Sequence, residues 1–361
     1  LLKNNVAVLP LSKQIRRIAL VGPLANNQDE VMGSWNARGN ARDVVTVKEG
    51  LRQKLGNEVV IDYIQGCDFT DPSKREFSAA FDAAQQSDVV IAVLGEKALM
   101  SGESRSRAML RLPGQQEALL DTLHKAGKPL VVVLMNGRPL CLQKVDTLAD
   151  ALLEAWFPGT QTGHAVADIL FGDVVPAGKL TTSFPLTEGQ IPNYYNYKRS
   201  GRPGDMPYSS TVRHIDVPNH NLYPFGYGLS YTTFSYGKMQ CPEQFSADGT
   251  LRVSVDVTNT GRFDGEEIVQ LYVADKVASM VRPVKELKGF QKLFIAKGQT
   301  RRVDFVLDVH NLGFYDNQMR YVIEPGTFEI MVGSDSETLQ KRSVVWLGET
   351  LPRQAKDHIS R

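Results

Sequence analysis

The first half of the chain alternates short apolar runs with segments in which apolar residues recur every three or four positions. Such runs are typical of strands buried on both faces of a sheet, and such spacing is typical of amphipathic helices. Strands and helices in alternation predict right-handed crossovers and an α/β fold with a mainly parallel sheet sandwiched by helices. The predicted strands are residues 17–21, 59–64, 88–94, 129–135 and 151–157, and the predicted helices are residues 47–54, 77–86, 115–125 and 163–171.

The pattern changes after residue 185. Residues 186–234 are polar, aromatic and rich in Pro and Gly without a steady periodicity, which predicts a connecting segment that runs over a surface. Beyond it, short alternating segments are separated by turn sequences such as Asn259-Thr260-Gly261. Roughly seven short strands in about 110 residues are typical of an all-β, immunoglobulin-like or fibronectin type III-like sandwich. The predicted strands are residues 251–259, 268–274, 301–307, 319–323, 327–332 and 343–347.

Length and charge set limits on the kind of protein. A chain of 361 residues, 42% hydrophobic and 22% charged, is long enough for two or three domains with a sizeable core. The net charge of +1 gives no long-range field that would attract nucleic acid or an anionic membrane, so we expect neither as a partner. The predicted units are an α/β sandwich domain at 1–185, a connecting segment at 186–234, an all-β domain at 235–350 and a C-terminal tail at 351–361.

The cysteines and the apolar stretches indicate no special class. Cys67, Cys141 and Cys241 lie far apart, which favours three buried thiols over a disulfide framework or a metal site. No apolar stretch approaches the roughly 18 to 20 residues that a membrane-spanning helix needs, and the first residues lack a signal-peptide pattern. We expect no metal and no cofactor.

A polar loop follows the apolar run at 88–94 and carries a lone acid, Glu103. Ligands collect at the carboxyl ends of strands in open α/β sheets, so this carboxyl group is a candidate proton donor. The competing interpretation is a solvated glutamate paired with Arg105 or Arg107, since guanidinium groups favour the ionised form that a donor must avoid. A second carboxylate roughly 5 to 5.5 Å away, as in retaining glycosidases, would favour the protonated form. The sequence shows no convincing partner of that kind.

A second candidate is Trp35, which follows Gly33 and Ser34 in a polar loop. Indole faces stack well on sugar rings, and the alternative is a tryptophan that caps the sheet. Two other classes are poorly supported. The loop Gly22-Pro23-Leu24-Ala25-Asn26-Asn27 lacks the spaced glycines of a nucleotide site, and no serine lies in a Gly-x-Ser-x-Gly elbow.

Several motifs resemble glycoside hydrolase family 3, and the resemblance covers nearly the whole chain. The motif that begins at Tyr223 is highly specific, and two motifs beyond residue 280 resemble the fibronectin-type domain that ends many members. Within the family, the chain is most similar to the periplasmic β-glucosidase type. The motifs are Leu94-Gly95-Glu96 with Ser101-Gly102-Glu103, Phe157-Pro158-Gly159-Thr160-Gln161-Thr162-Gly163, Gly178-Lys179-Leu180, Ser183-Phe184-Pro185, Tyr223-Pro224-Phe225-Gly226-Tyr227-Gly228-Leu229-Ser230-Tyr231-Thr232-Thr233-Phe234, Arg282-Pro283-Val284-Lys285-Glu286-Leu287-Lys288-Gly289-Phe290 and Glu324-Pro325-Gly326.

The resemblance implies a retaining β-glucosidase in which an N-terminal (β/α)8 barrel carries the nucleophilic aspartate and precedes the α/β sandwich. The sequence from Leu1 resembles the family's entry into that second domain, so we expect the barrel, and with it the nucleophile, to be absent here. The resemblance assigns the acid/base role to Glu103, with Glu96 as a competitor because loops around this residue diverge among members. It also implies that Trp35 forms an aromatic wall beside the cleavage point.

These assignments lead to expectations for the chain as a whole. We expect a β-glucoside or short oligosaccharide as the substrate, a periplasmic location by resemblance, and no useful turnover without the barrel. The barrel-facing surface should pair with a barrel domain, in cis or in trans, or with a second copy in a homo-oligomer. The alternative is a non-catalytic carbohydrate-binding or scaffold module, with Trp35, Tyr194, Tyr195 and Tyr197 as a sugar platform. For the tyrosines we favour packing against the fibronectin-type domain.

Overall fold

A six-stranded sheet forms the centre of the first domain of the computed structural model, which describes residues 1–204, 210–246, 248–348 and 351–352. The strand order is β1-β6-β5-β4-β2-β3. Strands β2 to β6 pair in parallel, and only the short edge strand β1 runs antiparallel to its neighbour β6. The strands are β1 (Lys3–Asn4), β2 (Arg17–Val21), β3 (Val60–Ile64), β4 (Val89–Gly95), β5 (Leu130–Met135) and β6 (Ala151–Glu154).

Helices cover both faces of this sheet, and each face has its own hydrophobic core. In β4, Val89, Ile91 and Val93 belong to the core shared with α1 and α5, whereas the alternate residues belong to the core shared with α2, α3 and α4. Successive side chains of a strand point to opposite faces, which explains the continuous apolar run. The helices are α1 (Val47–Leu55), α2 (Phe77–Gln86), α3 (Gln116–His124), α4 (Gln143–Leu148) and α5 (Thr162–Leu170).

The contact between α1 and α5 depends on two glycines that let the helix backbones meet. A Cβ atom added to Gly163 would lie 2.0 Å from the carbonyl oxygen of Thr46, and one added to Gly50 would lie 2.2 Å from the carbonyl oxygen of Gly163. We expect Gly163→Ala to lower the free energy of unfolding by roughly 2 kcal/mol, because the helices must separate and the better helix propensity of alanine does not offset this.

The measurement is urea denaturation of the wild type and the variant. Gly178→Ala is the matched control, since a Cβ there would meet nothing within 4 Å. Equal midpoints for wild type, Gly163→Ala and Gly178→Ala would contradict the prediction.

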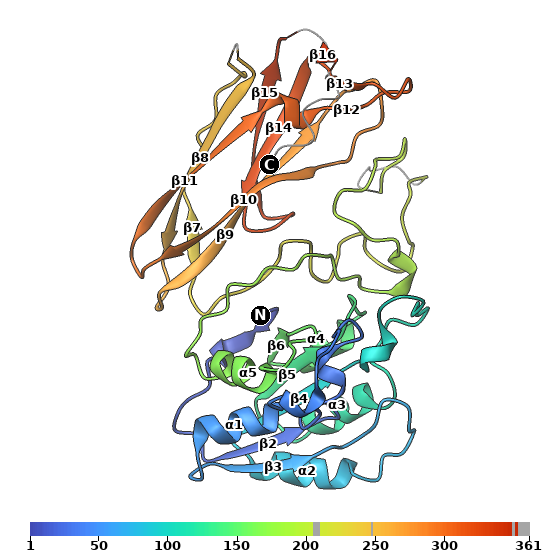
Figure 1. The fold of residues 1–361 in the computed structure, drawn as a ribbon, viewed down its shortest axis with the longest axis vertical. Helices are drawn as coiled ribbons and strands as arrows, with labels where there is room; N and C mark the ends of the chain where they lie inside the picture. Colours follow the sequence, from blue (N-terminus) through green and yellow to red (C-terminus); the bar gives the residue numbers. More distant parts are fainter. Residues whose placement is uncertain (205–209, 247, 349–350, 353–361) are drawn as a thin grey trace.

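The second domain is a β-sandwich of two antiparallel sheets, seen at the top of Figure 1 in orange and red. Four strands form one sheet in the order β10-β9-β14-β15, and three form the other in the order β11-β8-β7. A small third sheet of β12, β13 and β16 lies beside them. The strands are β7 (Phe234–Tyr236), β8 (Thr250–Asn259), β9 (Gly265–Asp275), β10 (Glu286–Ile295), β11 (Thr300–Asp308), β12 (Phe314–Tyr315), β13 (Tyr321–Ile323), β14 (Gly326–Gly333), β15 (Leu339–Trp346) and β16 (Leu351–Pro352).

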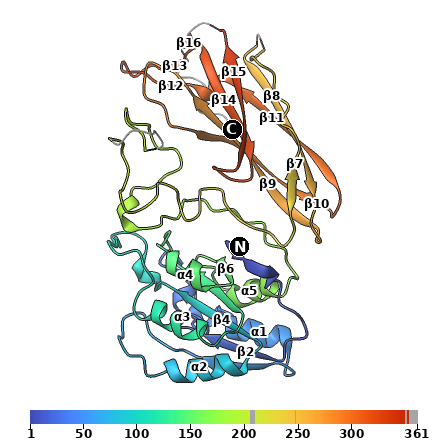
Figure 2. The ribbon, with the colours of Figure 1, turned by 180° about the vertical axis from the view of Figure 1, so that it is seen from behind.

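The segment that begins at Tyr223 connects the two domains, and both ribbon views show the chain around it running between them (Figures 1 and 2). Leu180 donates its backbone N–H to the carbonyl oxygen of Tyr227 at 2.8 Å on the α/β side. Gln270 of the sandwich donates its side-chain amide to the carbonyl oxygen of Gly226 at 3.0 Å. A largely buried ion pair, Lys179 to Glu267 at 3.4 Å, adds a further link between the domains.

The predicted fold class is confirmed, with differences in single elements. The strand β10 and the six-residue helix α4 were not predicted, and β6 ends at Glu154 instead of residue 157 because Trp156 has a left-handed backbone, with φ of 54°. The limits chosen for the domains stay predictions, and residues 353–361 of the predicted tail lie outside the described residues.

Candidate active site

The loop that carries Glu103 leaves the sheet at the carboxyl end of β4 and returns at the start of α3. The fully buried side chain of Gln116 holds both ends of the loop. Its carbonyl oxygen accepts from the N–H of Gly95 at 2.8 Å, and its amide donates to the carbonyl oxygen of Gly95 at 2.8 Å and to that of Pro113 at 2.9 Å. The loop is therefore anchored at its base by satisfied buried hydrogen bonds.

Glu103 lies exposed in the middle of this loop. Within the described part of the chain, its side chain forms no hydrogen bond and no ion pair, so neither Arg105 nor Arg107 holds it. Its neighbours have left-handed backbones, with φ of 110° at Gly102 and 58° at Ser104, which turns the chain sharply around the carboxylate. The carboxylate is free to meet a group that approaches from outside the chain.

Trp35 lies next to this turn. A Cβ atom added to Gly102 would lie 2.5 Å from Oγ of Ser34 and 3.2 Å from Nε1 of Trp35, so the two loops touch. The carboxylate of Glu30 ties them together, because it accepts the N–H of Ala98 at 2.7 Å. The indole is 75% exposed, which excludes the alternative of a tryptophan that caps the sheet. The structure thus places in contact the two loops that carry the site residues singled out from the sequence.

Glu96 has a different environment. Its side chain is completely buried and is paired with the guanidinium groups of Arg107 and Arg138. The Glu96 Oε1 to Arg138 Nε distance is 3.3 Å, and Oε2 accepts the N–H of Gly137 at 3.3 Å. A carboxylate with two cationic partners and no exposure has no route to a substrate.

Two further polar groups lie at the carboxyl ends of neighbouring strands, and the sequence analysis missed them. Asn136 follows β5 and donates its side-chain amide to a carboxylate oxygen of Glu154, the last residue of β6, at 3.3 Å. Glu154 also accepts the N–H of Trp156 at 3.0 Å. Desolvation of this carboxyl group raises its pKa to about 8, and the nearby charge of Glu96 acts in the same direction. The sequence could have indicated Asn136 and Glu154, because each is a polar residue at the end of a buried apolar run.

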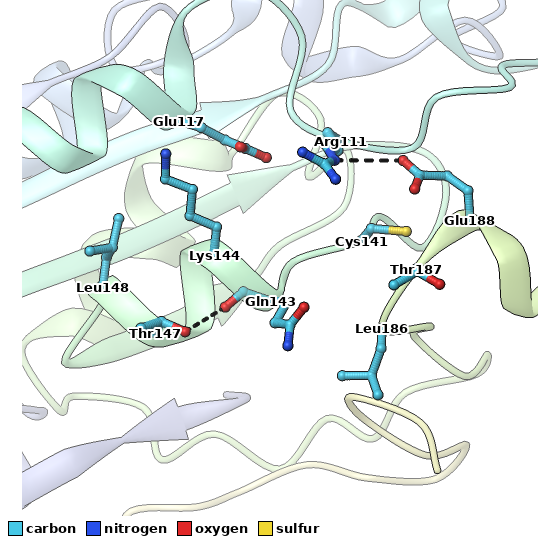
Figure 3. A pocket seen from close by; sticks show the side chains of 10 residues that line it. All are labelled: Arg111, Glu117, Cys141, Gln143, Lys144, Thr147, Leu148, Leu186, Thr187 and Glu188. Atoms are coloured by element: carbon cyan, nitrogen blue, oxygen red, sulfur yellow. Dashed lines mark hydrogen bonds and ion pairs between the residues drawn. The ribbon is translucent and has the colours of Figure 1, made fainter. Parts of the chain in front are cut away.

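A cavity of 380 Å³ lies elsewhere, between α3, α4 and the connecting segment (Figure 3). Its lining has mixed charge, with Arg111 at 3.9 Å from Glu188, and it includes neither Glu103 nor Trp35. Burial raises the pKa of the Cys141 thiol in this cavity to about 12, so the thiol is a poor nucleophile. Burial also raises the pKa of Glu117 in the lining, and this carboxyl group lies apart from the loop of Glu103.

The tyrosines of the connecting segment divide into two groups. Tyr195 packs against the sandwich domain, because its ring stacks on Phe225 at a centroid distance of 4.2 Å and meets Tyr272 edge-on at 5.8 Å. Its hydroxyl oxygen accepts the N–H of Leu287. Tyr194 and Tyr197 are about half exposed. Packing against the sandwich thus accounts for Tyr195.

The cysteines and the possible metal-ligating side chains can be examined in the part of the chain that the structure describes. All three cysteines are buried free thiols, as the sequence predicted. In the described residues, no group of three or more His, Cys, Asp and Glu side chains is placed to hold a metal ion. None of the helices that the structure describes combines the length and the apolar character needed to cross a membrane.

The α/β sheet domain joined to a fibronectin type III-like sandwich is the arrangement found in the C-terminal part of a class of glycoside hydrolases. Residues 1–231 match the glycosyl hydrolase family 3 C-terminal domain, and residues 267–336 match the fibronectin type III-like domain. The chain therefore belongs to glycosyl hydrolase family 3, which confirms the resemblance drawn from its motifs.

Individual relatives agree with this assignment. The chain is 44% identical to a periplasmic beta-glucosidase of Salmonella typhimurium and 40% identical to a beta-xylosidase of Formosa agariphila, each match covering 95% of this chain and 48% of the relative. The crystal structure of a beta-glucosidase from Listeria innocua in complex with glucose is similar with a TM-score of 0.91 at 40% identity, over 97% of this chain and 48% of that one. The chain spans about half the length of the relatives it matches.

Proposed function

We propose that this chain supplies the general acid/base, Glu103, and an aromatic sugar contact, Trp35, to a retaining β-glucosidase. The nucleophilic aspartate would come from a (β/α)8 barrel that is not among these 361 residues. The observation that carries the proposal is an exposed carboxylate that has no partner in the described part of the chain, on a loop that touches the loop of an exposed indole at the carboxyl end of β4. The burial of Glu96 between two arginines favours Glu103 over this competitor.

The proposed reaction has two steps. The barrel aspartate attacks the anomeric carbon while Glu103 protonates the departing glycosidic oxygen, which gives a covalent glycosyl-enzyme. Glu103 then removes a proton from water, and the water displaces the aspartate from the anomeric carbon. Two displacements at the same carbon retain its configuration.

Names of relatives support the substrate class and the compartment that we propose. The relatives include beta-glucosidases and a beta-xylosidase, and one of them is a periplasmic beta-glucosidase. We infer a substrate with a β-linked glucose or a similar sugar at its non-reducing end, and a periplasmic location. The coverage of about half of each relative leaves room for a barrel domain, joined in cis or supplied in trans.

The experiment that tests the proposal compares the 361-residue chain alone with the same chain mixed with a purified barrel domain. We expect no useful hydrolysis of an aryl β-glucoside by the chain alone, because the covalent route needs the nucleophile. Hydrolysis should appear when the barrel is added. Turnover by the chain alone at a rate like that of complete family members would contradict the proposal.

The second candidate function is a non-catalytic carbohydrate-binding or scaffold module. The exposure of Trp35, Tyr194 and Tyr197 favours it, because exposed aromatic rings can form a platform for sugars. The two functions differ in their dependence on Glu103. Sugar binding by such a module should survive Glu103→Gln, and the module should produce no hydrolysis with any barrel.

A further inference from the structure

We propose that Glu96 is a positioning residue for the acid/base loop. In this proposal its buried carboxylate holds the guanidinium groups of Arg107 and Arg138, and these fix the backbone on both sides of Glu103. The inference rests on the proposed function, because it assigns a role in setting the geometry of the proton donor. It gives Glu96 a role other than proton transfer.

Glu96 is a fixed point from which the loop can be held. Its backbone N–H donates to the carbonyl oxygen of Met135 in β5 at 2.9 Å, so its position is set by the sheet. Its side chain has no exposure, and its carboxylate accepts the N–H of Gly137 as well as the two guanidinium groups. A carboxylate with this many partners has little freedom to move.

Arg138 connects the fixed carboxylate of Glu96 to the backbone of the loop. One terminal nitrogen of its guanidinium group donates to the carbonyl oxygen of Met100, and also to that of Arg105 at 2.7 Å. These two carbonyl groups lie on either side of Gly102 and Glu103 in the sequence. The planar guanidinium group thus spans the turn that presents the carboxylate.

Arg107 fixes the loop on the far side of Glu103. It donates from one nitrogen to the Glu96 carboxylate and from the other to the carbonyl oxygen of Arg111 at 3.2 Å. Between Met100 and Arg107 the chain has no helix or strand, and within this segment the N–H of Arg105 donates to the carbonyl oxygen of Gly102 at 3.3 Å. We infer that the guanidinium contacts add to this single turn hydrogen bond in fixing the conformation of the segment.

The negative charge of Glu96 explains why this residue matters most among the three side chains Glu96, Arg107 and Arg138. The side chains of Arg107 and Arg138 are only 20% and 19% exposed and point at the same carboxylate. Without the negative charge, two poorly solvated cations would face each other, and they would move apart to reach water. Their movement would release the carbonyl groups that flank Glu103.

The first measurement is amide hydrogen exchange of the chain. We expect Glu96→Gln to raise the exchange rate of residues 101–106 at least tenfold while the strands β4 and β5 keep their protection. Lys54→Met is the matched control, because it removes a largely buried cation that pairs with Asp168 at 2.6 Å on another face of the domain. This control should leave the exchange of residues 101–106 unchanged.

A second variant provides an independent test in case Glu96→Gln does not fold. Arg138→Lys keeps the charge balance with Glu96 but cannot reach both carbonyl groups with one planar group. It should raise the exchange of the same residues while the rest of the domain stays protected. A uniform rise over the domain, or no rise at residues 101–106 in either variant, would overturn the inference.

The second measurement uses the enzyme reconstituted with a barrel domain. We expect Glu96→Gln to lower kcat/KM, which reports the first displacement, for an alkyl β-glucoside roughly 10- to 100-fold, with a much smaller loss of kcat/KM for a dinitrophenyl β-glucoside, whose leaving group needs no proton. KM for the alkyl glucoside should change little, because Glu96 does not touch the sugar. A loss of equal size for both substrates would indicate a structural role only and would overturn the inference.

The two proposals fail in different ways. If Glu103→Gln leaves hydrolysis unchanged, the proposed function is wrong, and the positioning role falls with it. If Glu103→Gln removes hydrolysis of the alkyl glucoside but Glu96→Gln does not alter the dependence on the leaving group, only the positioning role is wrong.

Discussion

Glu103→Gln should lower kcat for an alkyl β-glucoside by roughly 10²- to 10⁴-fold in the barrel-reconstituted enzyme, the range typical of general acid/base catalysis. The amide of glutamine preserves the size of the side chain but can neither give a proton to the glycosidic oxygen nor take one from water. Glu103 is exposed and lacks partners in the described structure, so the substitution breaks no contact of the fold. The loss should therefore appear in the rate and not in stability.

The leaving group and an added nucleophile reveal which step needs Glu103. A dinitrophenyl β-glucoside leaves without protonation, so the first step should be nearly normal and the glycosyl-enzyme should accumulate in a burst. Azide, which needs no general base, should then restore turnover. Glu58→Gln removes a carboxylate from another exposed position and serves as the control. Equal rate losses for both aryl and alkyl substrates, with no rescue by azide, would contradict the assignment.

The second large effect concerns stability and its dependence on pH. Desolvation raises the pKa of Glu154 from 4.5 to about 8 in the folded chain, so folding favours the protonated form. The contribution of Glu154 to the free energy of unfolding is therefore fully present below pH 4.5. It decreases as pH rises toward 8, because this carboxyl group ionises at a lower pH in the unfolded chain than in the folded chain. The expected loss is roughly 1.4 kcal/mol per pH unit, on the order of 5 kcal/mol in total.

Glu154→Gln should remove this dependence. We expect the free energy of unfolding of the variant, relative to wild type, to increase steadily from pH 5 to pH 8 and then to level off. The measurement is urea denaturation over this range, with Glu58→Gln as the control for the loss of an exposed carboxylate. A constant difference between Glu154→Gln and wild type at all pH values would contradict the assigned pKa.

The polar groups at the carboxyl ends of β4, β5 and β6 give this edge of the sheet a distinct character. Glu96 and Asn136 are completely buried, Glu154 is partly buried, and Asn136 contacts Glu154. Glu96 is neutralised by arginines, whereas Glu154 accepts hydrogen bonds and, among the described residues, contacts no cationic side chain. The proposed catalytic loop is built on this polar layer.

Local patterns in the sequence predicted most regular elements. The helix at residues 77–86 and the strand at residues 17–21 have the predicted bounds, because each is defined by its own periodicity. The strand β10 (Glu286–Ile295) was missed because its apolar and polar residues do not alternate steadily and Gly289 interrupts it. It forms the edge of its sheet, where only one neighbour constrains its side chains.

The candidate site was predicted in part. Glu103 and Trp35 were singled out because each is an unusual residue in a polar loop, and the structure places their loops in contact. The pairing of Glu96 with Arg138 escaped prediction because the two residues lie on loops after different strands. Asn136 and Glu154 were within reach, since ligands and polar groups gather at the carboxyl ends of parallel strands.

The sequence by itself determined the fold class, the family and two candidate glutamates, because periodicity and motifs are properties of neighbouring residues. Only the tertiary structure decided which glutamate is buried and which is exposed. That difference depends on Arg138, which reaches Glu96 from the loop after the adjacent strand β5, and on the sheet that excludes water from one carboxylate and leaves the other in solvent. Burial is a property of distant segments brought together, and no local pattern encodes it.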